Sequence, residues 1–187
     1  MSLNEDYLVS NIDGTPNYSV IQFKKKKSKI ALVIPVLNES YRIINQLEKI
    51  KELNPEVDVI IADGGSTDIS RSYFLNDNQT FSVLLTKMSA GGLSTQLRMA
   101  FHYCIEKSYE AVITMDGNNK DGVEGILAIN KALREGFDFV QGSRFIPGGT
   151  ATNTPFLRNL AIRFLHAPLT SIAVSYTHLT LPTIYSV

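Results

Sequence analysis

The segment KIALVIPVLNES, which runs from Lys29 to Ser40, decides which fold the chain can adopt. Its first part, Lys29–Val36, is almost continuously apolar and rich in β-branched side chains, and this pattern predicts a strand buried on both faces of a parallel sheet. The chain turns polar as soon as this run ends, at Asn38 and Glu39. Core packing does not need an asparagine and a glutamate there, so both residues are candidates for binding or catalysis.

Strands and helices alternate along the rest of the chain. Apolar runs predict further strands at Val57–Ala62, Phe81–Leu85, Ala111–Met115 and Phe137–Gln141. Apolar residues at helical spacing predict helices at Glu39–Leu53, Gly91–Ser108, Gly122–Arg134 and Pro155–His166, with a short helix after the turn GGSTD at residues 64–68. This alternation, with short connections, is typical of an open α/β sheet of the Rossmann-like kind, mostly parallel and flanked by helices.

Length and composition are those of one domain or part of one. The chain has 187 residues, of which 44% are hydrophobic and 19% charged, so it can bury a core. We expect residues 1–28 to be a polar preamble, in which NYSVIQF at 17–23 could add an edge strand, and residues 29–173 to form the domain. The net charge of zero gives no overall attraction to nucleic acid. The single Cys104 excludes an internal disulfide and a cysteine-based zinc site, and we expect it to fill the core.

The last segment, Val174–Val187, breaks this pattern, because it has neither charged residues nor a helical period. Its residues resemble the translation of a transposon-end sequencing adapter, followed by a barcode and the rest of the adapter. We therefore predict that residues 174–187 are a non-native tail, that the native sequence ends near Ala173 and that a C-terminal portion of the domain is missing. The alternative is a natural C-terminal strand.

No targeting or membrane-spanning segment is recognisable in the sequence. Residues 1–14 are too polar for a signal peptide, and no apolar run reaches the roughly 20 residues that a spanning helix needs. We therefore expect a soluble, cytoplasmic protein. The run Lys24–Lys27 is expected to be a solvated flank of the first strand, and the alternative is a weak contact with anionic lipid at the inner face of the membrane.

Three polar clusters follow predicted strands, namely PVLNES at 35–40, ADGGSTD at 62–68 and MDGNNKDG at 115–122. The carboxyl ends of parallel strands meet at one edge of an open α/β sheet, and ligands bind at that edge. Any one cluster could be an ordinary turn, since Asp, Asn and Gly are common turn residues. Three clusters at one edge favour a shared binding site.

The residue types in these clusters suit a nucleotide diphosphate with a divalent metal. Asp116 and Asn118 are separated by a glycine that allows a tight turn, so they could direct two oxygen atoms at Mg²⁺ or Mn²⁺. Glu39 and Asp63 accept hydrogen bonds when ionised, and would suit the N–H groups of a base or the hydroxyl groups of a ribose. Phosphate contacts are expected from the backbone N–H groups of Gly91 and Gly92 at a helix start, and from the charged side chains of Lys87 and Arg144.

In order and spacing, these residues resemble the motifs of family 2 glycosyltransferases, which have the GT-A fold. The pattern P-x-x-N-E corresponds to Pro35–Glu39, and D-[DG]-G-S-x-D corresponds to Asp63–Asp68. The metal motif D-x-D corresponds to Asp116–Asn118, and a G-S-R element corresponds to Gly142–Arg144. The resemblance runs from Lys29 to about Ala173 and is greatest to the branch of dolichol-phosphate mannose synthase-like and bacterial polyprenyl-phosphate sugar transferases.

The resemblance implies transfer of a sugar, with inversion, from a nucleotide-diphosphate sugar to an unidentified acceptor such as a polyprenyl phosphate or a glycan. Asp63 would bind the base, and Asp116 would be the catalytic carboxylate on the metal side of the diphosphate. Asn118 departs from the pattern, because an amide replaces the usual second aspartate, and metal affinity should fall unless Asp121 compensates. The full set of expected donor-binding residues is Pro35, Asn38, Glu39, Asp63, Gly64, Lys87, Gly91, Gly92, Asp116 and Arg144.

Other functions stay open at this point. A sugar-phosphate nucleotidyltransferase would need a glycine-rich, basic loop after the first strand, and PVLNES has none. An inactive homologue that only binds a nucleotide sugar is compatible with Asn118. No catalytic base for a hydroxyl acceptor is recognisable before Ala173, although a phosphate acceptor would need none, so the chain could bind its donor without turnover. A dinucleotide-binding dehydrogenase is disfavoured because no G-x-G-x-x-G follows a strand.

Overall fold

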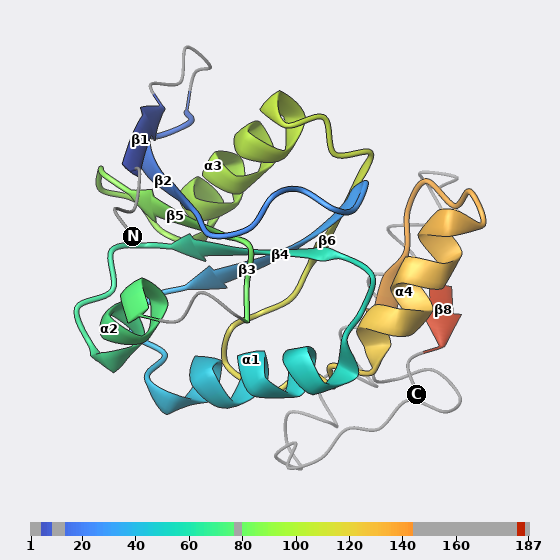
Figure 1. Ribbon diagram of the computed structural model, residues 1–187. Helices are drawn as coiled ribbons and strands as arrows, with labels where there is room; N and C mark the ends of the chain where they lie inside the picture. Colours follow the sequence, from blue (N-terminus) through green and yellow to red (C-terminus); the bar gives the residue numbers. More distant parts are fainter. Residues whose placement is uncertain (1–4, 9–13, 77–79, 144–182, 186–187) are drawn as a thin grey trace, which may run out of the picture. The chain divides into compact units, whose positions relative to one another are not determined.

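A computed structural model of the chain describes residues 5–8, 14–76, 80–143 and 183–185. The chain divides into two compact units, Met1–Ile126 and Leu127–Val187, and each is described by itself. The first unit contains a six-stranded sheet with the strand order β1-β2-β5-β4-β3-β6 (Figure 1). In that order the strands are Glu5–Leu8, Tyr18–Gln22, Val83–Lys87, Asp58–Asp63, Ile30–Val36 and Ala111–Thr114.

The sheet is parallel at its centre and antiparallel at one side. Strand β3 pairs with β4 and β6, and β4 pairs with β5, all in parallel. The register aligns the carboxyl ends, since Val36 faces Asp63 and Asp63 faces Thr86. Every residue of Ile30–Val36 is buried, which confirms the strand predicted from the apolar run. The predicted α/β class with a mostly parallel central sheet is therefore confirmed.

Helices cover both faces of this sheet. Helices α1 (Tyr41–Leu53) and α2 (Ile69–Asn76) lie on one face, and α3 (Leu93–Glu106) lies on the other (Figure 1). The core on the α3 side joins alternate residues of the strands to the buried side of that helix, and includes Ala31, Val33, Ile60, Ala62, Met99, Ala100, Tyr103 and Cys104. The intervening strand residues Leu32 and Ile34 are equally buried, as are Ile43, Leu47 and Ile50 of α1. Side chains of β3 thus pack on both faces, as expected for a central parallel strand.

The amino-terminal residues contribute more to the sheet than the sequence predicts. The segment 17–23 does form a strand, but β2 lies between β1 and β5 rather than at the edge, and it pairs antiparallel with both. The edge strand is β1, within the region expected to be a polar preamble. Tyr18 explains the inner position, because its ring is fully buried and its hydroxyl lies 2.7 Å from His102 Nδ1 of α3.

The second unit contains most of α4 (Gly125–Arg134) and a two-stranded parallel sheet of β7 (Gln141–Ser143) and β8 (Thr183–Tyr185). The predicted strand Phe137–Gln141 is wrong in its position, since only Gln141 lies in a strand. The backbone N–H groups of Gly136 and Phe137 instead donate to Leu133 and Ala132 and close the end of α4. Strand β8 belongs to the segment predicted to be non-native, and the origin of that segment stays a prediction. The predicted helix Pro155–His166 lies outside the described residues.

Cys104 lies in the core, as predicted, with 2% of its surface exposed. Burial raises the pKa of its thiol to about 12, an effect that the nearby charge of Lys26 only partly offsets. Because the pKa is higher in the folded chain, the unfolded chain loses its thiol proton first, at about pH 8.5. The thiol therefore contributes to stability below that pH, and the contribution is lost as pH rises toward 12.

We predict that a thiol reagent such as DTNB labels Cys104 at pH 8 only when the chain unfolds. The free energy of unfolding, measured with urea, should fall between pH 8 and pH 10, and should fall less in Cys104→Ala, which has no thiol to ionise. Rapid labelling of the folded chain at pH 8 would contradict this placement of the thiol.

Candidate functional site

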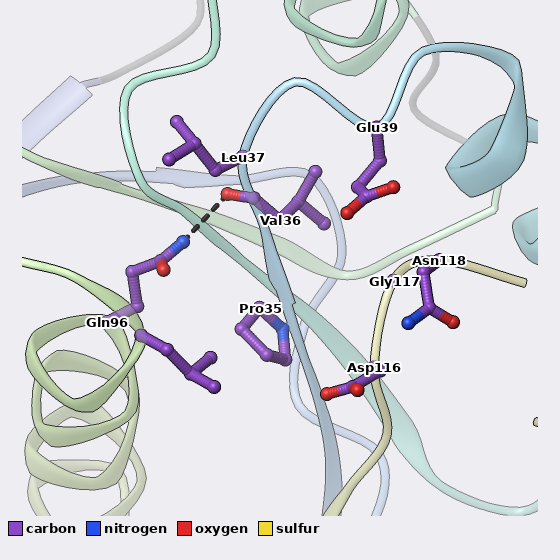
Figure 2. Close-up of a pocket in the computed structure, with 9 residues that line it drawn as sticks. Pro35, Val36, Leu37, Glu39, Gln96, Asp116, Gly117 and Asn118 are labelled. Carbon is purple, nitrogen blue, oxygen red and sulfur yellow. Dashed lines mark hydrogen bonds between the residues drawn. The ribbon is translucent and has the colours of Figure 1, made fainter. Parts of the chain in front are cut away.

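A pocket lies at the carboxyl end of β3, within the first unit. It has a volume of about 270 Å³, near the lower limit of small-ligand sites. The described residues that line it are Pro35, Val36, Leu37, Glu39, Leu93, Gln96, Asp116, Gly117 and Asn118 (Figure 2). They come from the end of β3 and the loop after it, from the first turn of α3 and from the loop after β6. Two of the three predicted polar clusters therefore meet in one cavity.

The loop after β6 presses its glycine against β3. A Cβ atom at Gly117 would lie 3.0 Å from the carbonyl oxygen of Pro35 and 3.0 Å from Cγ2 of Val36, so a side chain at this position would force those atoms apart. The glycine between Asp116 and Asn118 is thus explained by close packing. Because the backbone is held near β3, the side chains of Asp116 and Asn118 line the pocket on either side of the glycine (Figure 2).

The same loop is held from below by helix α1. Gln46 is fully buried; its Nε2 donates to the carbonyl oxygen of Asp116 at 2.9 Å, and its Oε1 accepts from the backbone N–H of Asn119 at 2.8 Å. Gln46 is not among the site residues predicted from the sequence. A signal was present, because the residue interrupts the apolar side of the predicted helix formed by Ile43, Leu47 and Ile50.

The amide of Asn118 is partly engaged within its own loop. Its Oδ1 accepts from the backbone N–H of Lys120 at 3.0 Å, a turn that asparagine commonly makes. A cation at this position would share that oxygen with the N–H group. Asp121, expected to compensate for the amide, is partly buried but is not among the described residues that line the pocket.

Glu39 lies in the loop before helix α1 rather than in its first turn, and it lines the pocket from there. Helix α1 begins at Tyr41 rather than Glu39, since Asn38 and Ser40 adopt positive φ angles of 54° and 51° that a helix cannot contain. Arg42 Nε lies 3.1 Å from Glu39 Oε2. That oxygen is nonetheless buried without a hydrogen bond, because the ion pair lacks the required alignment. Glu39 thus presents an incompletely satisfied carboxylate beside the pocket.

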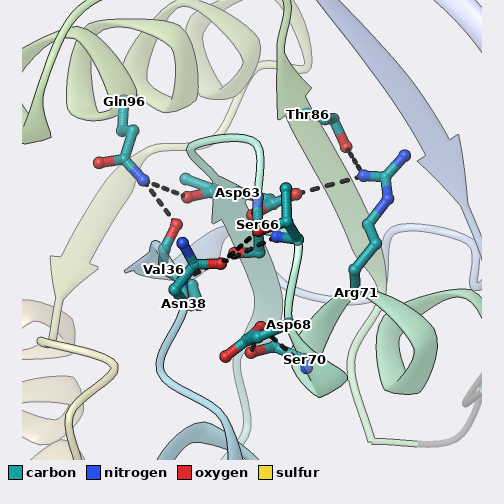
Figure 3. A network of polar contacts seen from close by, with 11 residues as sticks. Val36, Asn38, Asp63, Ser66, Asp68, Ser70, Arg71, Thr86 and Gln96 are labelled. Carbon is teal, nitrogen blue, oxygen red and sulfur yellow. Dashed lines mark hydrogen bonds and ion pairs between the residues drawn. The ribbon is translucent and has the colours of Figure 1, made fainter.

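Asp63, at the end of β4, does not line this pocket. It is fully buried, its Oδ1 accepts from the backbone N–H of Ser66 at 2.9 Å, and its Oδ2 lies 3.2 Å from Nη1 of Arg71 (Figure 3). The same Nη1 donates to Thr86 Oγ1 at 2.9 Å. In the described structure, Asp63 therefore holds the turn after β4 and pairs with α2, and its predicted contact with a base stays a prediction.

The loops after β3 and β4 are joined by polar side chains. Asn38 Oδ1 accepts from the backbone N–H of Thr67 at 2.8 Å, while the N–H of Asn38 donates to Ser66 Oγ at 3.0 Å. Asp68 accepts from both the N–H and the hydroxyl of Ser40, at 2.8 and 2.6 Å, and from the hydroxyl of Ser70 (Figure 3). Asn38 and Asp68 of the quoted motifs therefore hold the loops beside the pocket together by hydrogen bonds.

Gln96 of α3 closes the other side of the pocket. Its Nε2 donates to the carbonyl oxygens of Val36 at 2.7 Å and Ala62 at 3.1 Å, and so ties the ends of β3 and β4 to the helix (Figures 2 and 3). A Cβ atom at Gly64 would lie only 2.7 Å from that Nε2. Gly64, expected to bind the donor, therefore lies against Gln96, and a side chain there would displace the Gln96 amide.

The residues predicted to contact phosphate do not line the pocket in the described structure. Lys87 is buried, and its Nζ donates to the carbonyl oxygen of Gly91. Gly92 precedes α3, while Gly91 adopts a φ of 126°, so both glycines form the turn into the helix. None of these three residues lines the pocket among the described residues. Arg144 lies outside the described residues.

The donor set of the pocket fits a hard divalent cation that is shared with a ligand. Among residues 5–8, 14–76, 80–143 and 183–185, no group of three His, Cys, Asp or Glu side chains could hold a metal ion by itself. The pocket offers oxygen atoms from Glu39, Asp116 and Asn118, which is the chemistry that Mg²⁺ and Mn²⁺ prefer. Such ions commonly complete their coordination with water and substrate phosphates.

Comparison with protein families identifies the chain. A family model described as glycosyl transferase family 2 matches residues 31–180. The chain belongs to this family. The match spans the strand ends that form the pocket, so the predicted family is confirmed. It also extends into the segment from residue 174 that was predicted to be non-native.

Three curated proteins are similar to the chain. A polyprenol monophosphomannose synthase from Mycolicibacterium smegmatis is 26% identical over 131 residues, covering 68% of this chain and 49% of the relative. An undecaprenyl-phosphate mannosyltransferase from Micrococcus luteus is 27% identical over 134 residues, covering 71% and 55%. A dolichol-phosphate mannosyltransferase from Pyrococcus furiosus is 26% identical over 136 residues, covering 71% and 38%. The predicted branch is thus confirmed, and the chain spans about half the length or less of these relatives.

We predict that Gly64→Ala destabilises the family 2 domain by about 1–3 kcal/mol, because the added methyl group displaces the Gln96 amide from two backbone carbonyls. Urea unfolding would measure the loss. Gly125→Ala is the matched control, since a Cβ atom there meets nothing within 4 Å, and it should be neutral or slightly stabilising. Equal effects of the two substitutions would contradict the proposed packing.

We also predict an acid-dependent contribution from Asp68. Burial favours the neutral carboxyl, but hydrogen bonds from Ser40 and Ser70 outweigh it and lower the pKa of Asp68 below its ordinary value. A lowered pKa stabilises the fold above the unfolded value of about 3.9, and this stability is lost as pH falls through the folded value. Asp68→Asn should therefore cost about 1 kcal/mol at pH 7 and less at pH 3, by urea unfolding. An unchanged difference between the two pH values would refute this.

Proposed function

We propose that the chain is the donor-binding part of a glycosyltransferase that moves a sugar from a nucleotide-diphosphate sugar to a polyprenyl phosphate, with a divalent cation in the pocket. One observation carries the proposal. Glu39, Asp116 and Asn118 come from two separate motifs of the family and line one pocket at the carboxyl end of parallel strand β3. Ligands of open α/β sheets bind at that place.

The charge of the pocket supports a cation. Its described lining residues include the carboxylates of Glu39 and Asp116 and no Lys or Arg, and the Arg42 beside it is paired with Glu39. A diphosphate is itself anionic, so it would be repelled by the Asp116 carboxylate unless a cation lay between them. Mg²⁺ or Mn²⁺, held by Asp116 with the amide oxygen of Asn118, would supply charge compensation for the leaving diphosphate.

In this proposal, each residue of the pocket has a separate role in binding the donor. Asp116 orients the diphosphate end of the donor, and Glu39 accepts hydrogen bonds from donor hydroxyl groups. Pro35 and Leu93 give the pocket apolar walls that reduce access of water. In the transfer, an acceptor oxygen bonds to the anomeric carbon from the face opposite the diphosphate while the bond to the diphosphate oxygen breaks. Configuration is then inverted, and the nucleoside diphosphate carries away the electron pair.

A polyprenyl phosphate is proposed as the acceptor because the names of the similar proteins refer to polyprenol, undecaprenyl phosphate and dolichol phosphate. A phosphate acceptor is already ionised, so it needs no general base for its attack on the sugar. In the described part of the chain, no helix combines the length and the apolar character needed to cross a bilayer.

The lysine run Lys24–Lys27 lies at the amino end of the parallel strands, opposite the pocket at their carboxyl end. The backbone N–H of Lys27 donates to Asp58, the first residue of β4, while the pocket lies at the carboxyl end of β3. Lys26 is occupied, because its Nζ donates to the carbonyl oxygens of Lys107 and Ser108 at the end of α3. The strand between them is about 20 Å long, so a lipid contact through this run would not bring a membrane acceptor to the pocket.

A second function, nucleotide-sugar binding without transfer, is favoured by Asn118. Its Oδ1 already accepts a backbone hydrogen bond, and an amide carries no charge to attract a cation. The two functions differ in whether the bound donor is consumed.

We predict that Asp116→Asn weakens Mn²⁺-dependent binding of a nucleoside diphosphate at least about tenfold, because the charged oxygen ligand is lost. Asn118→Asp should strengthen it, since a second carboxylate replaces the amide. Isothermal calorimetry with Mn²⁺ and either GDP or UDP measures both effects. Asp138→Asn, which removes an exposed carboxylate outside the pocket, is the control and should leave affinity unchanged.

Unchanged affinity in Asp116→Asn would refute the proposed site. Release of nucleoside diphosphate from GDP-mannose or UDP-glucose in the presence of undecaprenyl phosphate separates the two functions. Turnover supports the transferase, whereas binding without turnover in this chain and in a longer chain covering the full length of the relatives supports the second function.

A further inference from the structure

Gln46 is the one residue of the buried side of α1 that is not aliphatic. The other buried residues of the helix are Ile43, Leu47 and Ile50, and Gln46 is as inaccessible to solvent as they are. Burying an amide is unfavourable unless its donor and its acceptor are both satisfied. Both are satisfied here by one loop, because Nε2 donates to Asp116 O and Oε1 accepts from Asn119 N.

The backbone groups that Gln46 binds lie beyond the end of the parallel pairing. Strand β6 pairs with β3 only as far as Thr114, and the N–H of Met115 makes one further bond to Val33 O at 3.1 Å. From Asp116 the chain leaves the sheet. The Gln46 amide then acts as the hydrogen-bonding partner that a neighbouring strand would otherwise supply, at both ends of the loop from Asp116 to Asn119.

We propose that Gln46 is a positioning residue that holds the loop Asp116–Asn119 in the geometry needed to bind the cation and diphosphate of the donor. This inference rests on the proposed function. Gly117 has no side chain, so without the bonds to Gln46 the backbone in the middle of the loop could turn freely. With the backbone fixed on either side, the side chains of Asp116 and Asn118 stay directed to the pocket. Binding then requires less ordering of the loop, which favours affinity.

Helix α1 connects this loop to the opposite wall of the pocket. Glu39 lies two residues before the helix starts, and Gln46 lies on its buried side. One rigid element therefore sets the positions of both carboxylate-bearing segments. Lys49 of the same helix adds a third contact, since its Nζ donates to Asn119 Oδ1 at 3.0 Å.

Only glutamine meets both requirements at this position. Glutamate has the same length but, when ionised, has no donor for Asp116 O. Methionine fills a similar volume but can replace neither hydrogen bond. Asparagine is one methylene shorter and would not span the distance from the helix to the loop. Gln46→Glu and Gln46→Met therefore remove one or both bonds while keeping the volume of the side chain.

The test uses the full chain and two measurements. Hydrogen–deuterium exchange without ligand reports the loop itself, and we expect exchange of residues 116–120 to rise at least about tenfold in Gln46→Met, while α3 and β4 stay protected. Electron paramagnetic resonance of Mn²⁺ with GDP or UDP reports binding, and we expect about tenfold weaker binding, the usual effect of losing an outer partner of a metal-binding group. Gln46→Glu should keep part of the protection of Asn119 and bind with intermediate affinity.

Leu47→Met is the matched control, because it alters a buried neighbour on the same helix that has no hydrogen bond to the loop. Its melting temperature is measured by circular dichroism, and loop exchange and Mn²⁺ affinity should be unchanged. If the Gln46 variants melt at a lowered temperature but show no more loop exchange and no weaker Mn²⁺ binding than the control, their role is purely structural and the inference is overturned.

Two outcomes separate this inference from the proposed function. If the unaltered chain binds neither nucleotide with Mn²⁺, the proposed function fails, and with it the donor-binding role of the loop. If the unaltered chain binds and Gln46→Met shows unchanged loop exchange or unchanged affinity, the positioning role fails while the proposed function stands.

Discussion

Burial of β3 on both faces is the constraint on which the rest of the described structure depends. A strand that is covered by helices on both sides and paired on both edges has no access to water for its backbone until it leaves the sheet. Polar residues can therefore gather only where it ends, after Val36. The parallel partners β4 and β6 end in the same region, so the loops that follow these strands meet at one edge.

Two buried glutamines make that edge possible. Irregular backbone at the end of a sheet leaves carbonyl and N–H groups without partners, and each would be costly if it were buried unsatisfied. Gln96 satisfies carbonyl groups at the ends of β3 and β4 from one face of the sheet, and Gln46 satisfies the loop after β6 from the other. Both helices thus act on the pocket through side-chain amides as well as through apolar packing. Gly64 and Gly117 complete the arrangement, because a side chain at Gly64 would displace the Gln96 amide and one at Gly117 would press on β3.

Electrostatics then limits what such a pocket can bind. Glu39 and Asp116 bring two carboxylates to a small cavity whose described lining includes no lysine or arginine, and Arg42 is paired with the first of them. A neutral sugar or a cation is compatible with this charge, whereas a bare diphosphate is not. The proposed metal ion would neutralise the phosphates of the donor at Asp116, and Asn118 would contribute only the oxygen of an amide that already accepts a backbone hydrogen bond.

The sequence by itself determined the class of fold, the order of its central elements and the strand ends at which the polar motifs lie. These depend on periodicity and local composition, which the segments Lys29–Val36 and Tyr41–Leu53 carry within their own residues. The tertiary structure alone decided which polar residue faces the pocket and which is used inside the fold. Glu39 and Asp116 reach the pocket, whereas Asp63 is paired with Arg71 and Lys87 with a loop carbonyl. Local pattern did not place the strand at Phe137–Gln141 either, because the N–H of Phe137 closes the end of α4 and the strand begins only at Gln141. Such choices depend on hydrogen-bond partners such as Gln46 and Asp116, which are distant in sequence and become neighbours only when the helices pack on the sheet.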